Sequence, residues 1–132
     1  MKKATKSDIE TIKKAFIENY KDAKTELNYK NDYELLIAII LSAQCTDKRV
    51  NIITPALFEK YPSVKELSVA KLDDVKRLIN SCSFFNNKAQ NIIKMAQSVM
   101  QQYNGVIPHN QKELIKLAGV GNKTANVFMI ES

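Results

Sequence analysis

The stretch LAGVGNKTANV, residues 117–127, places two glycines two positions apart and follows them at once with a lysine. Glycine reaches positive φ at little cost and lets another backbone approach closely, so Gly119-Val120-Gly121 predicts a tight turn between two helices. The amides of these residues can then point outward together, beside the positive end of the next helix. We expect the turn to bind an anion such as a backbone phosphate, with a plain helix–helix turn as the alternative.

Lys123 falls in the first turn of the predicted last helix. A helix N-terminus disfavours added positive charge, so this position favours a neutral amine. A neutral amine is a nucleophile that can form a Schiff base with a sugar aldehyde. The other lysines are expected to be solvated charges, and Lys123 differs from them by its place beside the turn.

The composition indicates one helical domain with a core. The chain has 132 residues, of which 45% are hydrophobic, and it contains three glycines and three prolines. So few turn-forming residues favour long helices over many short strands. The net charge of +6 and the pI of about 9.3 suit a polyanionic partner, most often nucleic acid, although the charge also serves solubility.

Apolar residues at helical spacing predict an all-α fold. A buried strand is the alternative for LLIAIIL, residues 35–41, and Pro55 is expected to kink or divide its helix. We expect helices at about 7–20, from Asn31-Asp32 through a buried central segment, at 47–60, at 64–67, at 72–80, from Asn86-Asn87 to Tyr103 with a left-handed cap at Asn104-Gly105, from Pro108 to Leu117, and from about Asn122 onward.

A polar cluster, residues 42–47, directly follows the most apolar helix. Gln44 carries two donors and an acceptor that suit the edges of bases, while an ordinary helix-end residue is the alternative. Thr46 and Asp47 fit the start of the next helix.

Cys45 and Cys82 form no CxxC motif and no Cys/His cluster, so we expect no metal site in this segment. Reduced thiols of a cytoplasmic protein are expected, with a disulfide left open. The sequence shows no apolar signal core at its start and no apolar run long enough to span a bilayer.

Five stretches, taken together and in their order, resemble the helix-hairpin-helix DNA glycosylases, and within them the bacterial endonuclease III family. They are TELNY (25–29), ELLIAIILSAQCTD (34–47), FFNNKAQNIIK (84–94), NGVIP (104–108) and LAGVGNKTANV (117–127). The resemblance implies that residues 23–132 form most of a six-helix barrel, with the helix-hairpin-helix motif at about 110–132. It also implies that residues 1–22 form a helix that packs on a second domain.

The resemblance implies base excision repair of damaged double-stranded DNA in the bacterial nucleoid, with the damaged nucleotide flipped into a pocket. Lys123 matches the lysine that attacks the sugar, expels an oxidised pyrimidine and cuts the strand by Schiff-base β-elimination. Gln44 matches a residue that fills the gap in the duplex, Phe84 matches a wedge, and Gly119-Val120-Gly121 match the phosphate-binding turn.

Two alternatives to a base excision repair enzyme remain. A non-catalytic helix-hairpin-helix DNA-binding module would need neither Lys123 nor Gln44. An all-α interaction domain would carry its charge incidentally.

The chain departs from the family pattern at three places. Ala118 stands where the family has proline, and Ser83 stands where it has glycine. After Ser132 such enzymes continue to an activating aspartate and to four cysteines that hold a 4Fe-4S cluster. We therefore expect a C-terminally truncated chain that lacks the iron-sulfur domain and has impaired activity, with the cluster present in the full-length protein. His109 is expected at the surface without a role.

Overall fold

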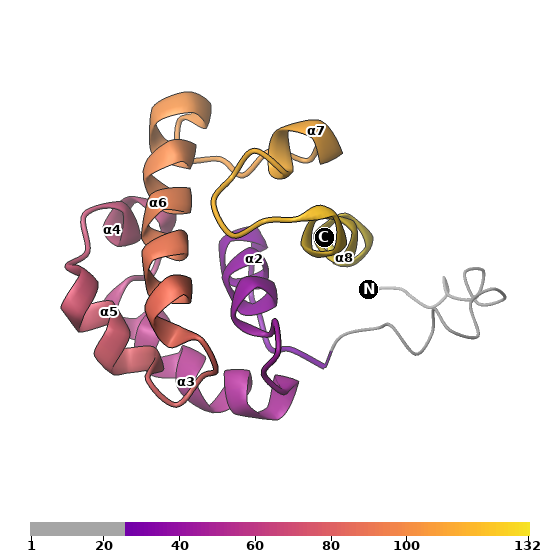
Figure 1. The fold of residues 1–132 in the computed structure, drawn as a ribbon. Helices are drawn as coiled ribbons and strands as arrows, with labels where there is room; N and C mark the ends of the chain where they lie inside the picture. The colour runs from indigo at the N-terminus through magenta and orange to yellow at the C-terminus, as the bar shows by residue number, and fades with distance from the viewer. Residues whose placement is uncertain (1–25) are drawn as a thin grey trace, which may run out of the picture.

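The computed structural model describes residues 26–132, and within that range it contains helices and no strand (Figure 1). The helices are α2 (Asp32–Leu41), α3 (Asp47–Lys60), α4 (Val64–Ser68), α5 (Leu72–Ile79), α6 (Phe85–Tyr103), α7 (Gln111–Leu114) and α8 (Asn122–Glu131). The predicted all-α fold is confirmed, and the strand alternative for residues 35–41 is wrong. The predicted helix at 7–20 and the segment 1–22 lie outside the described residues.

Helix α2 is the centre of the fold. Its sequence is apolar on every side, and all its residues from Tyr33 to Leu41 are buried. The Asn31 side chain accepts a hydrogen bond from the Glu34 amide at 2.9 Å, which starts the helix as predicted. In Figure 1 α2 lies between α6 and α8, and it packs against α3 as well. A helix enclosed in this way must have the polar groups at its ends satisfied by the protein.

Helix α3 starts where the sequence predicts and continues through its proline. The Thr46 hydroxyl accepts a hydrogen bond from the Arg49 amide at 3.1 Å. Of the two effects expected at Pro55, a kink or a division, division is wrong, because the helix runs unbroken to Lys60. Pro55 is exposed, so water can reach the carbonyl that lacks its usual intrahelical donor.

Helix α6 forms the long wall on which α4 and α5 pack (Figure 1). It begins at Phe85, one residue before the predicted start, and ends at Tyr103. Asn104 and Gly105 have φ of 54° and 84°, so the predicted left-handed cap is confirmed. The side of α6 that faces the core buries Ala89, Ile92, Ile93, Met95, Ala96 and Val99.

Helix α7 is shorter than the predicted helix from Pro108 to Leu117. Asn110 caps it by accepting a hydrogen bond from the Glu113 amide. After Leu114 the chain continues as tight turns, in which the Lys116 amide donates to the Glu113 carbonyl and the Leu117 amide to the Leu114 carbonyl. These shorter-range bonds tighten the chain ahead of the glycine turn.

The two glycines of the turn between α7 and α8 meet different constraints. Gly119 has φ of 81°, and a Cβ there would lie 3.0 Å from Asn91 Cβ and 3.4 Å from Ile40 Cγ2. Gly121 is the N-cap of α8 with an extended backbone, and a Cβ there would meet nothing within 4 Å. The fold therefore requires glycine at 119 but not at 121.

This difference predicts that a serine substitution changes the free energy of unfolding differently at the two glycines. Gly119→Ser should lower the free energy of unfolding by about 1–3 kcal/mol, because it combines a left-handed backbone with a steric clash. Gly121→Ser should leave it unchanged or raise it by roughly 0.5 kcal/mol, because serine is a good N-cap in extended backbone. Urea unfolding followed by circular dichroism measures both, and equal losses in the two variants would contradict this description of the turn.

Candidate functional site

The predicted site residues come from segments that meet around the C-terminal end of α2. The turn carrying Gln44 follows α2 directly, and Phe84 precedes the first residue of α6. Gly119 packs closely against Ile40 of α2 and Asn91 of α6. Helix α8, which packs along α2, begins directly after the glycine turn. The fold thus gathers segments that lie up to 80 residues apart in the sequence on one part of the molecule.

Gln44 projects from a strained turn. The Cys45 amide donates to the Ser42 carbonyl at 3.0 Å, and Gln44, the third residue of this four-residue turn, has φ of 55°. Such a position favours glycine or asparagine over glutamine. Gln44 is exposed, and no hydrogen bond in the described part of the chain engages its side chain. Its amide group is therefore available to a partner.

Phe84 is an exposed aromatic residue at the start of α6. Its relative exposure is 62%, and its φ of 57° also lies in the left-handed region. Ser83 does not have positive φ, so the loop forms without the glycine that the family resemblance led us to expect there. An aromatic side chain held in strained backbone and left in solvent suits a role outside the core.

The glycine turn offers fewer free amides than the sequence led us to expect. The Val120 amide donates to the Leu117 carbonyl at 3.1 Å, and its side chain is buried. No hydrogen bond within residues 26–132 uses the amides of Gly119 or Gly121, and no side chain caps α8. The available donors are therefore these two amides and those of the first turn of α8.

Lys123 lies in that first turn and is exposed. The first turn of α8 contains no acidic residue, and no ion pair in the described region includes Lys123. Lys48 and Arg49, both exposed in the first turn of α3, add positive charge after the Gln44 turn. The surface around the end of α2 therefore combines cations with unpaired amides, which suits a polyanion.

Lys88 is a residue of this region that the sequence analysis missed. Its side chain lies in the protein interior, where Nζ donates to the Leu41 carbonyl at 2.8 Å and to the Ala43 carbonyl at 2.5 Å. The signal was present in the sequence, because Lys88 stands four residues before Ile92 on the apolar side of α6. A lysine at a core position of a helix indicates buried acceptors.

Both cysteines are free thiols, and Cys82 is buried. The Cys82 thiol donates to the Leu41 carbonyl at 3.2 Å. Burial raises the pKa of Cys82, as does the neighbouring Cys45, while Lys88 acts in the opposite direction. The described residues contain no group of three or more His, Cys, Asp or Glu side chains that could hold a metal ion. They therefore do not fit the predicted iron-sulfur cluster, which would need other cysteines.

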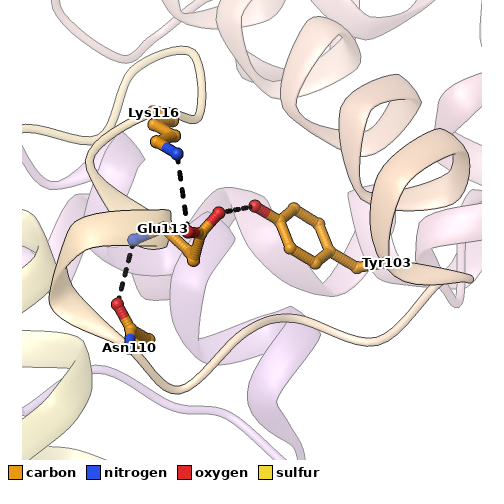
Figure 2. Close-up of polar contacts among 4 residues, drawn as sticks. All are labelled: Tyr103, Asn110, Glu113 and Lys116. Carbon is orange, nitrogen blue, oxygen red and sulfur yellow. Dashed lines mark hydrogen bonds and ion pairs between the residues drawn. The ribbon is translucent and has the colours of Figure 1, made fainter.

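A network of polar side chains fixes α7 against the end of α6. Figure 2 shows the Tyr103 hydroxyl donating to one carboxylate oxygen of Glu113, while Lys116 Nζ lies 3.4 Å from the other. The hydrogen bond from Tyr103 lowers the pKa of Glu113. Because α7 leads into the glycine turn, this network helps to hold the turn in place.

His109, for which we expected no role, joins three segments. Its Nε2 lies 3.0 Å from Asp32 Oδ2, at the start of α2. Its ring lies 5.3 Å from the ring of Phe128 in α8, measured between centroids. His109 thus ties the chain before α7 to both of these helices.

The structure also contains a cavity of about 780 Å³. It is lined by the segment from Leu27 to Asn31 and by residues of α3 such as Thr54 and Phe58. None of the predicted site residues contributes to it. We therefore place the candidate site on the surface around the end of α2.

No helix of the described region is long and apolar enough to cross a membrane.

Comparisons with known proteins show which family the chain resembles. The HhH-GPD superfamily of base excision DNA repair proteins matches residues 37–130. Endonuclease III of Rickettsia felis is 45% identical over 121 residues, which cover 92% of this chain and 57% of that protein. Endonuclease III of a Synechocystis strain is 44% identical over 110 residues, which cover 83% of this chain and 50% of that protein. The chain thus spans about half the length of the curated relatives it matches.

A solved structure extends the similarity to three dimensions. A trapped endonuclease III–DNA covalent intermediate superposes with a TM-score of 0.80 at 42% identity, covering 96% of this chain and 60% of that one. The predicted resemblance to endonuclease III is confirmed. On the match over residues 37–130, the chain belongs to the HhH-GPD superfamily of base excision DNA repair proteins.

Proposed function

We propose that this chain carries the DNA-binding surface and the nucleophile of a bifunctional DNA glycosylase that acts on damaged double-stranded DNA. One observation carries the proposal. The free amides of the glycine turn, the exposed Gln44 and Phe84 side chains and the lysine of α8 come from separate segments that converge at the end of α2. A plain helix–helix turn would need none of the other three features.

The binding step follows from charge and geometry. A backbone phosphate would accept hydrogen bonds from the amides of Gly119 and Gly121 and from those of the first turn of α8. The net charge of +6 adds attraction that does not depend on DNA sequence. Gln44 and Phe84 would enter the duplex where a damaged nucleotide leaves the stack, since an amide can bond base edges and a phenyl ring can stack on them.

The proposed chemistry uses Lys123. Its amine would attack C1′ of the flipped nucleotide, so that an N–C bond forms, the nitrogen gives up a proton and the bond from C1′ to the base breaks. The base, an oxidised pyrimidine in our proposal, leaves with the electron pair and takes a proton. The sugar ring opens to a Schiff base, and loss of a C2′ proton expels the 3′ phosphate by β-elimination. Water then hydrolyses the Schiff base and frees the lysine.

The similar solved structure supports a covalent route, because it is an endonuclease III–DNA covalent intermediate. An amine nucleophile needs no metal and no cofactor for this step. The position of Lys123 next to the phosphate-binding amides would bring the amine close to the sugar that carries that phosphate.

The nucleophile is tested by trapping. Borohydride added to the wild-type chain with a duplex containing one abasic site should give a covalent adduct with the mass of protein plus DNA strand. Lys123→Ala should give none, because the Schiff base cannot form, whereas Lys65→Ala in α4 should trap like wild type. An adduct in Lys123→Ala would refute the assignment. If wild type gives no adduct but binds DNA, the non-catalytic DNA-binding module is favoured.

The phosphate site is tested at Gly121. Gly121→Ser places a hydroxyl where it can accept from the first amides of α8, so those amides no longer serve a phosphate. Affinity for an abasic-site duplex should fall by about tenfold, the effect of losing roughly one charge-assisted hydrogen bond. Fluorescence anisotropy measures the affinity, with Ala56→Ser at an exposed position of α3 as the control. Unchanged affinity in Gly121→Ser would exclude a phosphate bound by the first amides of α8.

A further inference from the structure

Lys88 has an environment that the packing of α6 alone does not explain. It is 6% exposed, at a position where the pattern of α6 calls for an apolar residue. A buried ammonium is costly unless its protons are bound. Here Nζ contacts the Leu41 carbonyl at 2.8 Å, the Ala43 carbonyl at 2.5 Å and Cys82 Sγ at 3.3 Å. These acceptors match the three protons of an ammonium.

These contacts reach the peptide group that leads into Gln44. The Leu41 carbonyl belongs to the last turn of α2, where the helix dipole favours a cation. The Ala43 carbonyl belongs to the peptide that joins Ala43 to Gln44. By holding that peptide, Lys88 fixes the direction in which the Gln44 turn leaves α2.

The backbone of Lys88 makes the second connection. Its amide donates to the Phe84 carbonyl at 3.0 Å, in the first turn of α6. Among the described residues with side chains, positive φ occurs at Gln44, Phe84 and Asn104. Asparagine tolerates this conformation, so Gln44 and Phe84 are the unusual ones. The Gln44 turn is bonded to the Lys88 side chain, and Phe84 is joined to Lys88 by the ordinary backbone bond of the first turn of α6.

We infer that Lys88 is a positioning residue that sets the Gln44 and Phe84 loops at a fixed spacing, so that both side chains enter the duplex at one damaged nucleotide. This inference rests on the proposed function of the two side chains. Lys88 itself is buried and touches no DNA. It acts by selecting one arrangement of two loops whose backbones are strained and would otherwise relax.

The test compares two affinities. Lys88→Met removes the ammonium but keeps an unbranched side chain. It should weaken binding to a duplex with a stable abasic-site analogue by about tenfold, and binding to the undamaged duplex by less than about twofold. Binding to the undamaged duplex changes little because that duplex still contacts the glycine turn and the surface cations. In a Gln44→Ala/Phe84→Ala background, adding Lys88→Met should change the ratio of the two affinities, the preference for the abasic site, by less than about twofold. In that background neither side chain remains to be positioned.

A destabilised control separates positioning from stability. Val64→Ala in α4 removes buried apolar volume away from the site. In a Val64→Ala variant whose urea midpoint is as low as that of Lys88→Met, the ratio of the affinities for abasic-site and undamaged duplex should stay that of wild type. If Lys88→Met shows no cooperative unfolding transition, Lys88→Gln replaces it with the same expected direction. The inference is overturned if the lysine variant keeps the preference, if Val64→Ala loses it equally, or if the loss persists in the double-alanine background.

A measurement without DNA distinguishes failure of this inference from failure of the proposed function. In NMR spectra of the free chain, the backbone carbon and amide signals of Gln44 and Phe84 should both move in Lys88→Met and stay in place in Val64→Ala. If wild type shows no preference for the abasic site, the proposed function fails for this chain. Unmoved signals in Lys88→Met would overturn the positioning role whatever the DNA result.

Discussion

The enclosure of α2 is the constraint on which the rest of the structure depends. A helix that is apolar on all sides must be surrounded, and α3, α6 and α8 do so. Its last carbonyls then lie in the interior and need donors. The Ser42 hydroxyl bonds the Ile39 carbonyl at 2.7 Å, and Lys88 bonds the Leu41 carbonyl. The requirement to satisfy this helix end brings a charged side chain of α6 to the place where the chain turns outward.

That helix end also organises the surface. The Lys88 side chain bonds the turn that carries Gln44, and the Lys88 backbone amide bonds the Phe84 carbonyl. The glycine turn packs against Ile40 of α2 and Asn91 of α6. The candidate site is therefore a surface shared by several segments and not a single cavity. Such a surface suits a long polyanion with one displaced nucleotide better than it suits a small molecule.

Local signals in the sequence predicted most of the fold. Asn31 and Thr46 cap their helices by side-chain bonds a few residues away, and the Asn104-Gly105 cap depends on their tolerance for positive φ. The buried run of α2 was readable from its composition. Whether Pro55 would kink or divide α3 was not readable, because it depends on which side of the helix faces water.

The site was only partly predictable, for a physical reason. The residue types of the glycine turn and its lysine were visible, because their chemistry lies within a few positions. The bonds of Lys88 to Leu41 and Ala43 span 47 and 45 positions, and no local pattern encodes them. The hydrogen bond from the Val120 amide to the Leu117 carbonyl also depends on how α7 ends, and tertiary packing decides where it ends.

We propose that the surface at the end of α2 binds damaged DNA. Hydrogen–deuterium exchange of the 132-residue chain, with and without a duplex that contains an abasic-site analogue, tests it most directly. We expect slower exchange in residues 42–46, 83–88 and 117–124, with α4 and α5 unchanged. Protection confined to α4 and α5, or no protection at a DNA concentration that saturates binding, would contradict it.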